Sequence, residues 1–268
     1  MNNTFTENTV NGVAYMTTPV ITAKHAFTTR AGGVSSGGFS SLNFGYGRGD
    51  PADNVTENYR RLGKTLEIDT FSAAFTKQVH GNTVRVCTDR ERAKPTDPAD
   101  YEADGLVTNV PGLPLLAFTA DCVPVLLHDP VAKVAAAVHC GWRSSVADIL
   151  GEAVGKMAAL GSAPSDIRAA IGPAIGRCCF ETGPEVPEAV RSWLGGCAEN
   201  FYAPEAGVPG KFMVDLRAAN RERLLQLGVL PEHIAVSDEC TVCQPKKYWS
   251  HRGAKGGERG SQCAVICL

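Results

Sequence analysis

The chain has 268 residues, of which 44% are hydrophobic and 20% are charged, and its formal net charge is −2. This apolar content can offset the entropy of ordering, so a mostly disordered chain is excluded. The near-neutral charge gives no electrostatic basis for binding nucleic acid or a membrane surface, and we expect neither as a partner. No apolar run is long enough for a membrane span, and the first twenty residues lack the parts of a secretory signal, so we expect a cytoplasmic protein.

Apolar patterning predicts more strands than helices. We expect strands at residues 25–29, 73–79, 113–118, 123–127, 134–139, 167–171, 234–237 and 262–267. Helical periodicity predicts helices at residues 55–66, 146–160 and 216–227. Because the strands come in runs and do not alternate regularly with helices, we expect an α+β fold with mixed sheets, not a doubly wound one. Residues 25–268 are expected to form a single domain, with residues 1–24 as an N-terminal extension packed on or beside it.

Two of the six histidines and one cysteine lie where predicted strands open into turns. His80 and His139 each end an apolar run, and Cys122 follows Asp121 between two apolar strands. A catalytic zinc site uses three protein ligands and leaves the fourth position to water or substrate. His80, Cys122 and His139 are therefore a candidate zinc site, although their long spacing leaves open whether they meet. Buried cysteines are also often inert, and that interpretation of Cys122 stays open.

The C-terminal cysteines offer a rival metal site, which strand geometry disfavours. The pairs Cys240, Cys243 and Cys263, Cys267 resemble four-thiolate zinc spacing. On one strand, however, Cys263 and Cys267 would lie ~13 Å apart, whereas two ligands of one zinc lie within ~4 Å of each other. We therefore predict no zinc at Cys240 and Cys243, and we interpret the adjacent cysteines at 178–179 as structural thiols.

Cationic and glycine-rich segments supply candidate anion sites. Arg143 opens a predicted helix directly after His139, and a guanidinium beside free helix amides favours an anion. Arg30 and Asn43 lie in glycine-rich loops whose amides could hold a phosphate or a ribose. Arg252 lies in a cationic loop that could close over an anionic group. For each of these, a simple turn or a solvated surface side chain is the alternative.

Several motifs in this order resemble one family. They lie at residues 27–30, 43–45, 77–82, 103–108, 119–127, 138–143, 171–180 and 240–243. Together they are similar to the YfiH-type laccase-domain family, which is also labelled polyphenol oxidase and purine nucleoside phosphorylase. The resemblance covers about residues 25–268. It implies one catalytic domain with a layered α/β/β/α fold, similar to the catalytic domain of cytotoxic necrotizing factor.

The resemblance also implies a function. It implies zinc held by His80, Cys122 and His139, phosphorolysis of purine nucleosides including methylthioadenosine, and deamination of adenosine. The residues that we expect to act in catalysis are Cys122, Asp121 as a proton shuttle, and Arg143. Those that we expect to bind the nucleoside or phosphate are Arg30, Asn43, Arg143 and Arg252. Cys140 departs from the family pattern beside His139, but successive strand residues face opposite ways, so it should point away from the metal.

Other functions remain open. A metal-free cysteine hydrolase, such as an amidase acting on a peptidoglycan precursor, would use Cys122 as nucleophile and His139 as base. A copper-dependent polyphenol oxidase could use the same ligands, although blue-copper centres favour a weak axial ligand such as methionine. None of the four methionines is beside these ligands in the sequence. A non-enzymatic binding module is the last alternative. We expect a monomer or a small homo-oligomer.

Overall fold

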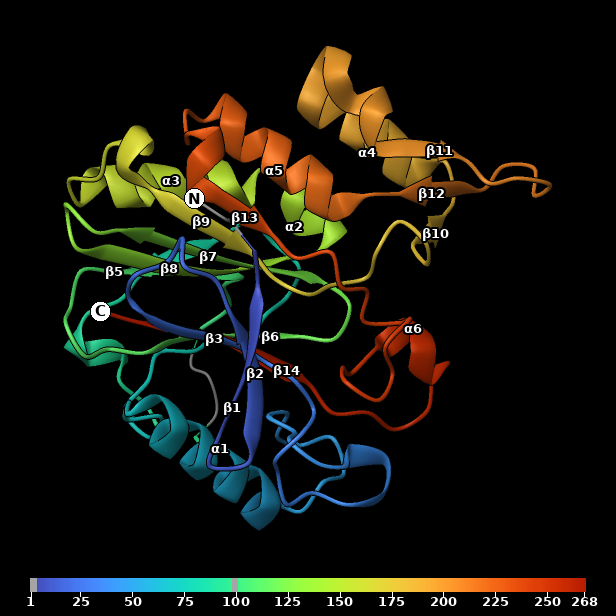
Figure 1. Ribbon diagram of the computed structural model, residues 1–268. Helices are drawn as coiled ribbons and strands as arrows, with labels where there is room; N and C mark the ends of the chain where they lie inside the picture. The colour runs from blue at the N-terminus through green and yellow to red at the C-terminus, as the bar shows by residue number, and fades with distance from the viewer. Residues whose placement is uncertain (1–3, 98–100) are drawn as a thin grey trace.

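Two β-sheets pack face to face between layers of helices in the computed structural model, which describes residues 4–97 and 101–268 (Figure 1). The larger sheet has six strands in the order β13-β9-β7-β8-β5-β4. These are β13 (Ile234–Val236), β9 (Arg168–Ile171), β7 (Val123–Asp129), β8 (Val134–Cys140), β5 (Gly105–Thr108) and β4 (Val84–Val86). Most neighbours are antiparallel, but β13 with β9 and β4 with β5 are parallel. The sheet is therefore mixed, as the sequence predicts.

The second sheet has five strands in the order β1-β2-β3-β14-β6. These are β1 (Thr6–Val10), β2 (Val13–Thr17), β3 (Lys24–Thr28), β14 (Gln262–Cys267) and β6 (Leu115–Thr119). The residues before the predicted first strand thus form a hairpin that extends this sheet at its edge. A three-stranded sheet, β10 (Glu181–Thr182), β12 (Phe212–Val214) and β11 (Tyr202–Pro204), lies apart from both.

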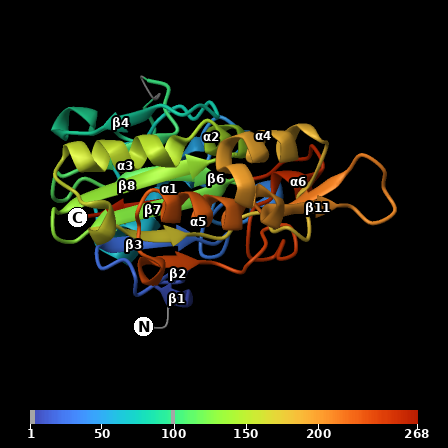
Figure 2. The ribbon, with the colours of Figure 1, turned by 90° about the horizontal axis from the view of Figure 1, so that it is seen from above.

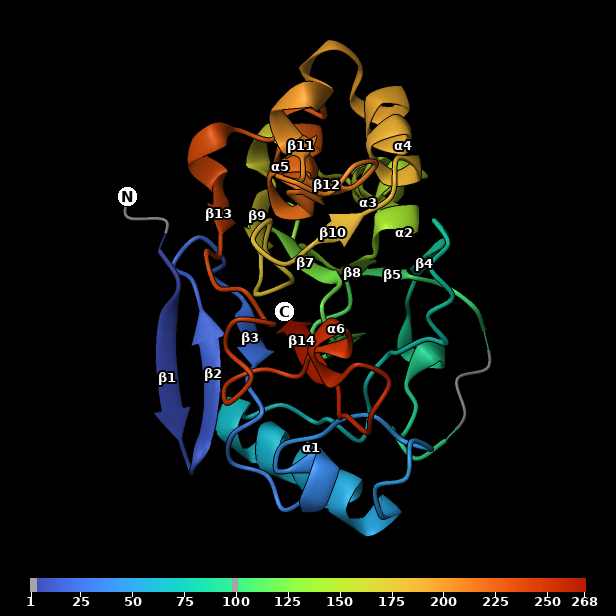
Figure 3. The same cartoon turned by 90° about the vertical axis from the view of Figure 1, so that its right-hand side faces the viewer.

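Helices cover the outer faces of the two large sheets. Figure 2 shows α3 (Ile149–Ala159) and α5 (Leu216–Gln226) over the larger sheet, and Figure 3 shows α1 (Ala52–Leu66) on the opposite side of the molecule. The remaining helices are α2 (Trp142–Val146), α4 (Glu185–Leu194) and α6 (His251–Ala254). The order of layers is α/β/β/α, in agreement with the expected fold class. None of the helices in the described ranges is long and apolar enough to cross a membrane.

Strand alternation assigns side chains to the separate cores. In β8, Val134, Ala136, Val138 and Cys140 pack under the helices. The intervening Ala135 and Ala137 pack between the two sheets. These small alanines let the two sheets approach closely. Because side chains alternate along the strand, His139 points to the same inner face as Ala135 and Ala137. Cys140 consequently lies on the opposite face from His139, as expected.

Two predicted elements are wrong in part, and side-chain hydrogen bonds explain both. Residues 73–79 form only isolated bridges, because Gln78 bonds with its side chain to the backbone N–H and C=O of Phe118. The predicted helix at 146–160 is broken between α2 and α3 at Asp148, whose φ is 66°. Two hydrogen bonds from Arg223 hold the Asp148 carboxylate at this break.

Candidate active site

The topology brings the three predicted ligands together at one end of the larger sheet. Cys122 precedes β7, and His139 lies near the end of β8, which pairs with β7 in the antiparallel direction. Asp104 precedes β5, whose start lies beside the end of β8 for the same reason. His80 reaches this point from the loop before β4. The start of one antiparallel strand meets the end of its neighbour, so residues far apart in sequence become adjacent.

The ligand atoms of His80, Cys122 and His139 lie within 4.8 Å of one another. The Cys122 Sγ is 3.9 Å from the His80 Nε2, and the two imidazole rings meet nearly edge to face at 4.9 Å between centroids. A Cβ at Gly141 would lie 2.9 Å from the His80 ring and 3.5 Å from the Cys122 Sγ, so the glycine keeps this space free. Two imidazoles and one thiolate match the donor set of an open zinc site, so the residues fit a metal ion.

Asp104 orients both histidines and has no role in the sequence analysis, although its motif is part of the family resemblance. Its buried carboxylate lies 2.8 Å from the His139 Nδ1. It also accepts backbone N–H bonds from Val79, His80 and Gly81, at 2.8–3.1 Å. A carboxylate accepts from an Nδ1–H, so the His139 Nε2 is left for a ligand, which is the usual arrangement around metal-binding histidines. The sequence feature that could have identified Asp104 is its position as an acidic residue directly before a buried strand.

The centre favours a charged thiol and imidazole when no metal is bound. Burial raises the pKa of Cys122, but the interactions with His139 and His80 outweigh it and lower that pKa to about 6. Burial lowers the pKa of His139, but Asp104 and Cys122 outweigh it and raise that pKa to about 9. Burial likewise raises the pKa of Asp104, whereas the bonds from His139 and the backbone keep it below its ordinary value. The thiolate form that metals and electrophiles require is therefore available at neutral pH.

A cavity of about 750 Å³ opens above this centre. Four aromatic side chains form much of its wall, and they are Tyr46, Phe118, Trp142 and Phe180. Three arginines also line it, and they are Arg48, Arg252 and Arg259. Helix α6, which carries Arg252, lies beyond the right-hand ends of the two large sheets in Figure 1, below α2. The cavity is thus apolar in part, cationic in part, and closed at its base by Cys122 and His139.

Asp121 lines the cavity, but both of its carboxylate oxygens already accept strong hydrogen bonds. The Thr241 hydroxyl donates to Oδ1 at 2.6 Å, and the backbone N–H of Arg252 donates to Oδ2 at 2.6 Å. The φ of Asp121 is 92° and that of His80 is 62°, a backbone region that costs free energy for residues other than glycine. Strained backbone on both sides of the centre fixes the directions of His80 and Cys122.

The predicted anion-binding residues lie in different places. Arg252 lines the cavity, but its guanidinium donates to the backbone oxygens of Cys179 and Glu181, both at 3.1 Å. Arg143 is exposed and is not among the residues that line the cavity, although its guanidinium lies 4.3 Å over the ring of Trp142, which does line it.

Arg30 and Asn43 support neighbouring loops and also do not line the cavity. Arg30 donates to the backbone oxygens of Ser40 and Pro245. The Asn43 side chain is fully buried and bonds to Asp50, to Gly45 and to the backbone N–H of Ser261. Their place in the structure is that of loop anchors.

Sequence reasoning did not single out Arg48, and it named Arg259 only as the end of the cationic loop, residues 250–259, that also carries Arg252. Burial lowers the pKa of Arg259, and the Arg48 charge lowers it further, whereas Asp121 and Cys122 raise it. The two guanidinium groups are thus close enough to repel each other, and both face the cavity. Neither makes an ion pair with a carboxylate among the described residues. An anion would relieve this repulsion.

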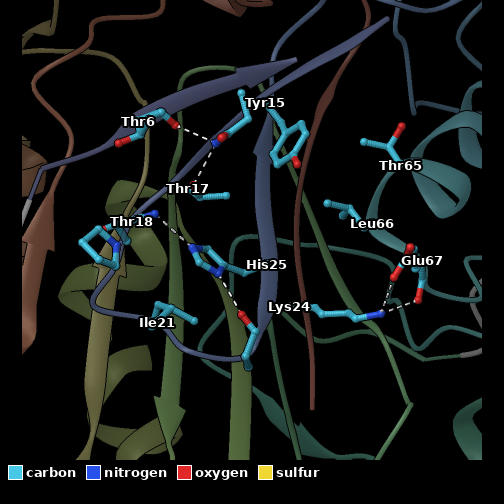
Figure 4. Close-up of a pocket in the computed structure, with 13 residues that line it drawn as sticks. Thr6, Tyr15, Thr17, Thr18, Ile21, Lys24, His25, Thr65, Leu66 and Glu67 are labelled. Carbon is cyan, nitrogen blue, oxygen red and sulfur yellow. Dashed lines mark hydrogen bonds and ion pairs between the residues drawn. The ribbon is translucent and has the colours of Figure 1, made fainter. Parts of the chain in front are cut away.

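A second pocket, of about 610 Å³, lies beside the N-terminal hairpin, away from the candidate centre (Figure 4). Its histidine, His25, accepts from the Thr18 N–H at 3.1 Å and bonds to the Ala23 C=O at 2.9 Å, as the dashed lines in Figure 4 show. Burial lowers the pKa of His25. Both ring nitrogens already have backbone partners, so this histidine supports the turn before β3.

The fold and the site together define a layered α/β/β/α protein with a candidate two-histidine, one-cysteine centre at the base of a pocket. The chain belongs to the family described as multi-copper polyphenol oxidoreductase laccase, whose model matches residues 24–268.

Similar proteins agree with this assignment. The purine nucleoside phosphorylase YlmD of Geobacillus stearothermophilus is 37% identical over 242 residues, which are 89% of this chain and 88% of the relative. A purine nucleoside phosphorylase of Deinococcus radiodurans is 36% identical and covers 97% of this chain and 95% of its own. The crystal structure of the Bacillus licheniformis hypothetical protein YfiH superposes with a TM-score of 0.89 at 30% identity, covering 97% of both chains.

Proposed function

We propose that this protein is a zinc-dependent purine nucleoside phosphorylase. The observation that carries the proposal is the group of His80, Cys122 and His139 beside a cavity of about 750 Å³, which has aromatic walls and two arginines without a carboxylate partner among the described residues. The names of the curated relatives support the same activity. A cavity of this size suits one nucleoside with a phosphate beside it.

The aromatic wall is suited to a purine. Phe118, Trp142 and Phe180 present flat apolar surfaces, on which a purine ring would stack. Gln78 also lines the cavity. Both ends of its side-chain amide bond to the backbone of Phe118, so its role is to hold that part of the wall in place. The wall gives affinity for any purine, which agrees with a broad nucleoside specificity.

Phosphate would bind between Arg48 and Arg259, the pair without carboxylate partners. In phosphorolysis a phosphate oxygen forms a bond to C1′ of the ribose while the bond from C1′ to the purine nitrogen breaks. The electron pair leaves with the purine, which takes up a proton, and the products are the free base and ribose 1-phosphate. Arg48 and Arg259 would orient the phosphate and balance its charge. A zinc ion held by the three ligands would supply Lewis-acid chemistry.

The same pocket would deaminate adenosine and cleave methylthioadenosine, because neither substrate needs a different wall. Asp121 was expected to shuttle protons. Its two strong hydrogen bonds support a different role, in which it fixes the turn that presents Cys122. His139 is held by Asp104 and would keep its orientation in both reactions.

The test is product analysis with purified protein of known metal content. Inosine with phosphate should give hypoxanthine and ribose 1-phosphate, and omission of phosphate should abolish the reaction. Adenosine without phosphate should give inosine. The absence of both reactions in zinc-loaded protein would refute the proposal. Oxidation of a phenol by copper-loaded protein would favour the polyphenol oxidase instead, although no methionine lines the pocket as a weak axial ligand.

A metal-free cysteine hydrolase is the second candidate, and the paired pKa shifts of Cys122 and His139 favour it. A thiolate beside an imidazolium is the resting form of a Cys–His nucleophile. Asp104 would then orient the base, as the third member of a triad does. Hydrolysis of peptide-like amides by chelator-treated protein, lost in Cys122→Ser, would select this candidate over the phosphorylase.

A further inference from the structure

Four cysteines from two separate loops converge beside the candidate active site. Cys178 and Cys179 lie in the turn after β9, and Cys240 and Cys243 lie in the turn after β13. Because β9 and β13 are parallel neighbours, both turns leave the same end of the sheet. A bridge between Ala174 and Cys240 continues the pairing beyond the strands. The topology thus joins two cysteine pairs that lie about sixty residues apart in sequence.

The four sulfur atoms have the separations of ligands that share one metal ion. All lie within 4.8 Å of one another, and the Cys243 Sγ is 3.5 Å from that of Cys178 and 3.4 Å from that of Cys179. A tetrahedral zinc with ~2.3 Å bonds to sulfur would place its ligands ~3.8 Å apart. Cys243 is about equally near both of its neighbours, so no single disulfide partner is preferred. One central ion explains the arrangement better than one covalent pair.

The backbone around the cluster is arranged to stabilise thiolate. The N–H of Gly176 donates to the Cys240 Sγ at 3.2 Å. A Cβ at Gly176 would lie 3.2 Å from both the Cys178 Sγ and the Cys240 Cβ, so this residue is small where the loops meet. Four thiolates this close would repel one another, and a divalent cation between them would balance their charge.

The cluster is also connected to the wall of the active-site pocket. Thr241, between Cys240 and Cys243, donates to the Asp121 carboxylate at 2.6 Å. The Arg252 guanidinium donates to the Cys179 carbonyl at 3.1 Å. Ile175 and Phe180 line the pocket from the first loop, and the Ile175 N–H donates to the Asp121 carbonyl at 2.9 Å. Fixing the two loops to each other would therefore fix this side of the pocket.

We propose that Cys178, Cys179, Cys240 and Cys243 bind one zinc ion in a closed tetrathiolate site, distinct from the His80–Cys122–His139 group, and that this ion fixes the two loops. This reverses the expectation that Cys240 and Cys243 bind no zinc. The sequence argument rightly excluded Cys263 and Cys267, which lie buried in β14, but it tested the wrong partners. The site does not depend on which reaction the neighbouring pocket performs.

Metal counting on protein purified in reductant and loaded with Zn²⁺ tests the proposal without an activity assay. The double variant Cys178→Ser/Cys243→Ser changes the two exposed ligands, so it should fold. Cys197→Ser alters a partly buried cysteine that belongs to neither group and serves as the control. We expect two zinc ions per chain in the wild type and the control, and one in the double variant. Co²⁺ bound to the Cys122→Ala variant should give the absorption of a tetrahedral thiolate site. Adding Cys178→Ser and Cys243→Ser to that variant should remove the sulfur-to-cobalt charge-transfer band.

Three results would overturn the proposal. The first is an unchanged zinc count in Cys178→Ser/Cys243→Ser, and the second is a wild type with a single zinc that Cys122→Ala loses. The third is a disulfide among the four cysteines in reductant-purified protein. For the second half of the proposal, hydrogen exchange at the Ile175 and Thr241 amides should become at least tenfold faster in the double variant. Unchanged exchange in a variant that has lost one zinc would show that the ion does not fix the loops.

Discussion

Asp104 accepts a hydrogen bond from the Nδ1 of His139 at 2.8 Å, and the same carboxylate oxygen accepts the backbone N–H of His80 at 2.9 Å. One buried side chain therefore sets the position of both imidazoles in the candidate centre. The arrangement explains why His80 can stay in place although it is exposed and its φ is 62°. Three of the predictions below follow from this centre.

Replacing Asp104 by Asn should weaken metal binding at the candidate centre. The amide keeps the size of the carboxylate but loses its charge and one acceptor, so the His139 tautomer and the turn at His80 are held less firmly. Loss of such an outer partner typically costs about 10- to 100-fold in metal affinity. Competition for zinc with a chelator of known affinity measures the change. An affinity equal to wild type in a folded variant would argue against the orienting role.

Replacing Cys122 by Ala should remove one zinc ion per chain and leave the fold largely intact. The side chain is a ligand in the proposal, and its loss leaves only two imidazoles. Cys140→Ala is the matched control, because Cys140 is adjacent to His139 but lies in the core on the other face of β8. That control should lose stability and keep its metal. Zinc counts and melting curves on both variants decide the point, and full occupancy in Cys122→Ala would be contrary to the assignment.

Gly141→Ala should disturb the centre by contact alone. The backbone of Gly141 has φ −65° and ψ 162°, which alanine adopts freely, but the new Cβ would lie 2.9 Å from the His80 ring. We expect weaker zinc binding with little change in melting temperature. Gly155→Ala in α3, where no atom lies within 4 Å of the new Cβ, should bind zinc normally and gain up to about 1 kcal/mol from helix propensity. Equal zinc affinity in both variants would contradict the steric argument.

Arg259→Ala should raise the phosphate requirement of nucleoside cleavage. Loss of one charge-assisted contact is worth about 1.5–3 kcal/mol, or roughly 10- to 150-fold in kcat/KM. Arg259→Lys keeps the positive charge and should recover part of the lost kcat/KM. Adenosine deamination uses no phosphate and should change less.

Arg143→Ala is the comparison for that prediction. The sequence analysis assigns the phosphate to Arg143, whereas its side chain is exposed and does not line the pocket, which supports a small effect. Kinetics at varied phosphate separate the two assignments. A large loss in Arg143→Ala with none in Arg259→Ala would restore the sequence-based assignment.

Asp148→Asn should lower stability at neutral pH and leave it unchanged in acid. Burial alone raises the pKa of Asp148, but the bonds from Arg223 and Trp193 outweigh it and hold the pKa below its ordinary value. A depressed folded pKa means that the carboxylate stabilises above its unfolded pKa of about 3.9, and that this contribution is lost as the pH falls through the folded pKa. We expect the free energy of unfolding of Asp148→Asn to be about 0.2–1 kcal/mol lower than that of the wild type at pH 7, because the pair of Asp148 and Arg223 is partly exposed.

Denaturant titrations from pH 7 to pH 2 check this prediction. Glu152→Gln, which removes an exposed carboxylate from the same helix, controls for the change in net charge. A constant difference between wild type and Asp148→Asn across the whole range would show that ionisation of Asp148 is not the cause.

The sequence predicted the centre of the fold better than its periphery. Strands β7, β8 and β14 each contain an apolar run of four or five residues, and such runs are recognisable because both faces of these strands are buried. The hairpin β1–β2 was missed because most of β1 is exposed on both faces, so it carries no alternation of apolar and polar residues. The break at Asp148 was missed because its cause, Arg223, lies 75 residues away in sequence.

The candidate site shows the same division. His80, Cys122 and His139 were recognisable because a polar side chain at the end of an apolar run stands out. Arg48 could not be recognised, since an arginine in a polar loop is a common surface pattern, and the loop of residues 250–259 gave no reason to prefer Arg259 over Arg252. The pairing of the cysteines depended on β9 and β13 being neighbours, which no local pattern expresses.

The position of β14 has a consequence for synthesis of the chain. This strand lies between β3 and β6 and pairs with both in the antiparallel direction. During translation, β3 and β6 leave the ribosome long before residues 262–267, so the two strands must wait with facing edges open. Unpaired apolar edges invite contacts with other chains. The hairpin β1–β2 covers only the other edge of β3, so the edges of β3 and β6 that face β14 stay open to such contacts until residues 262–267 are made.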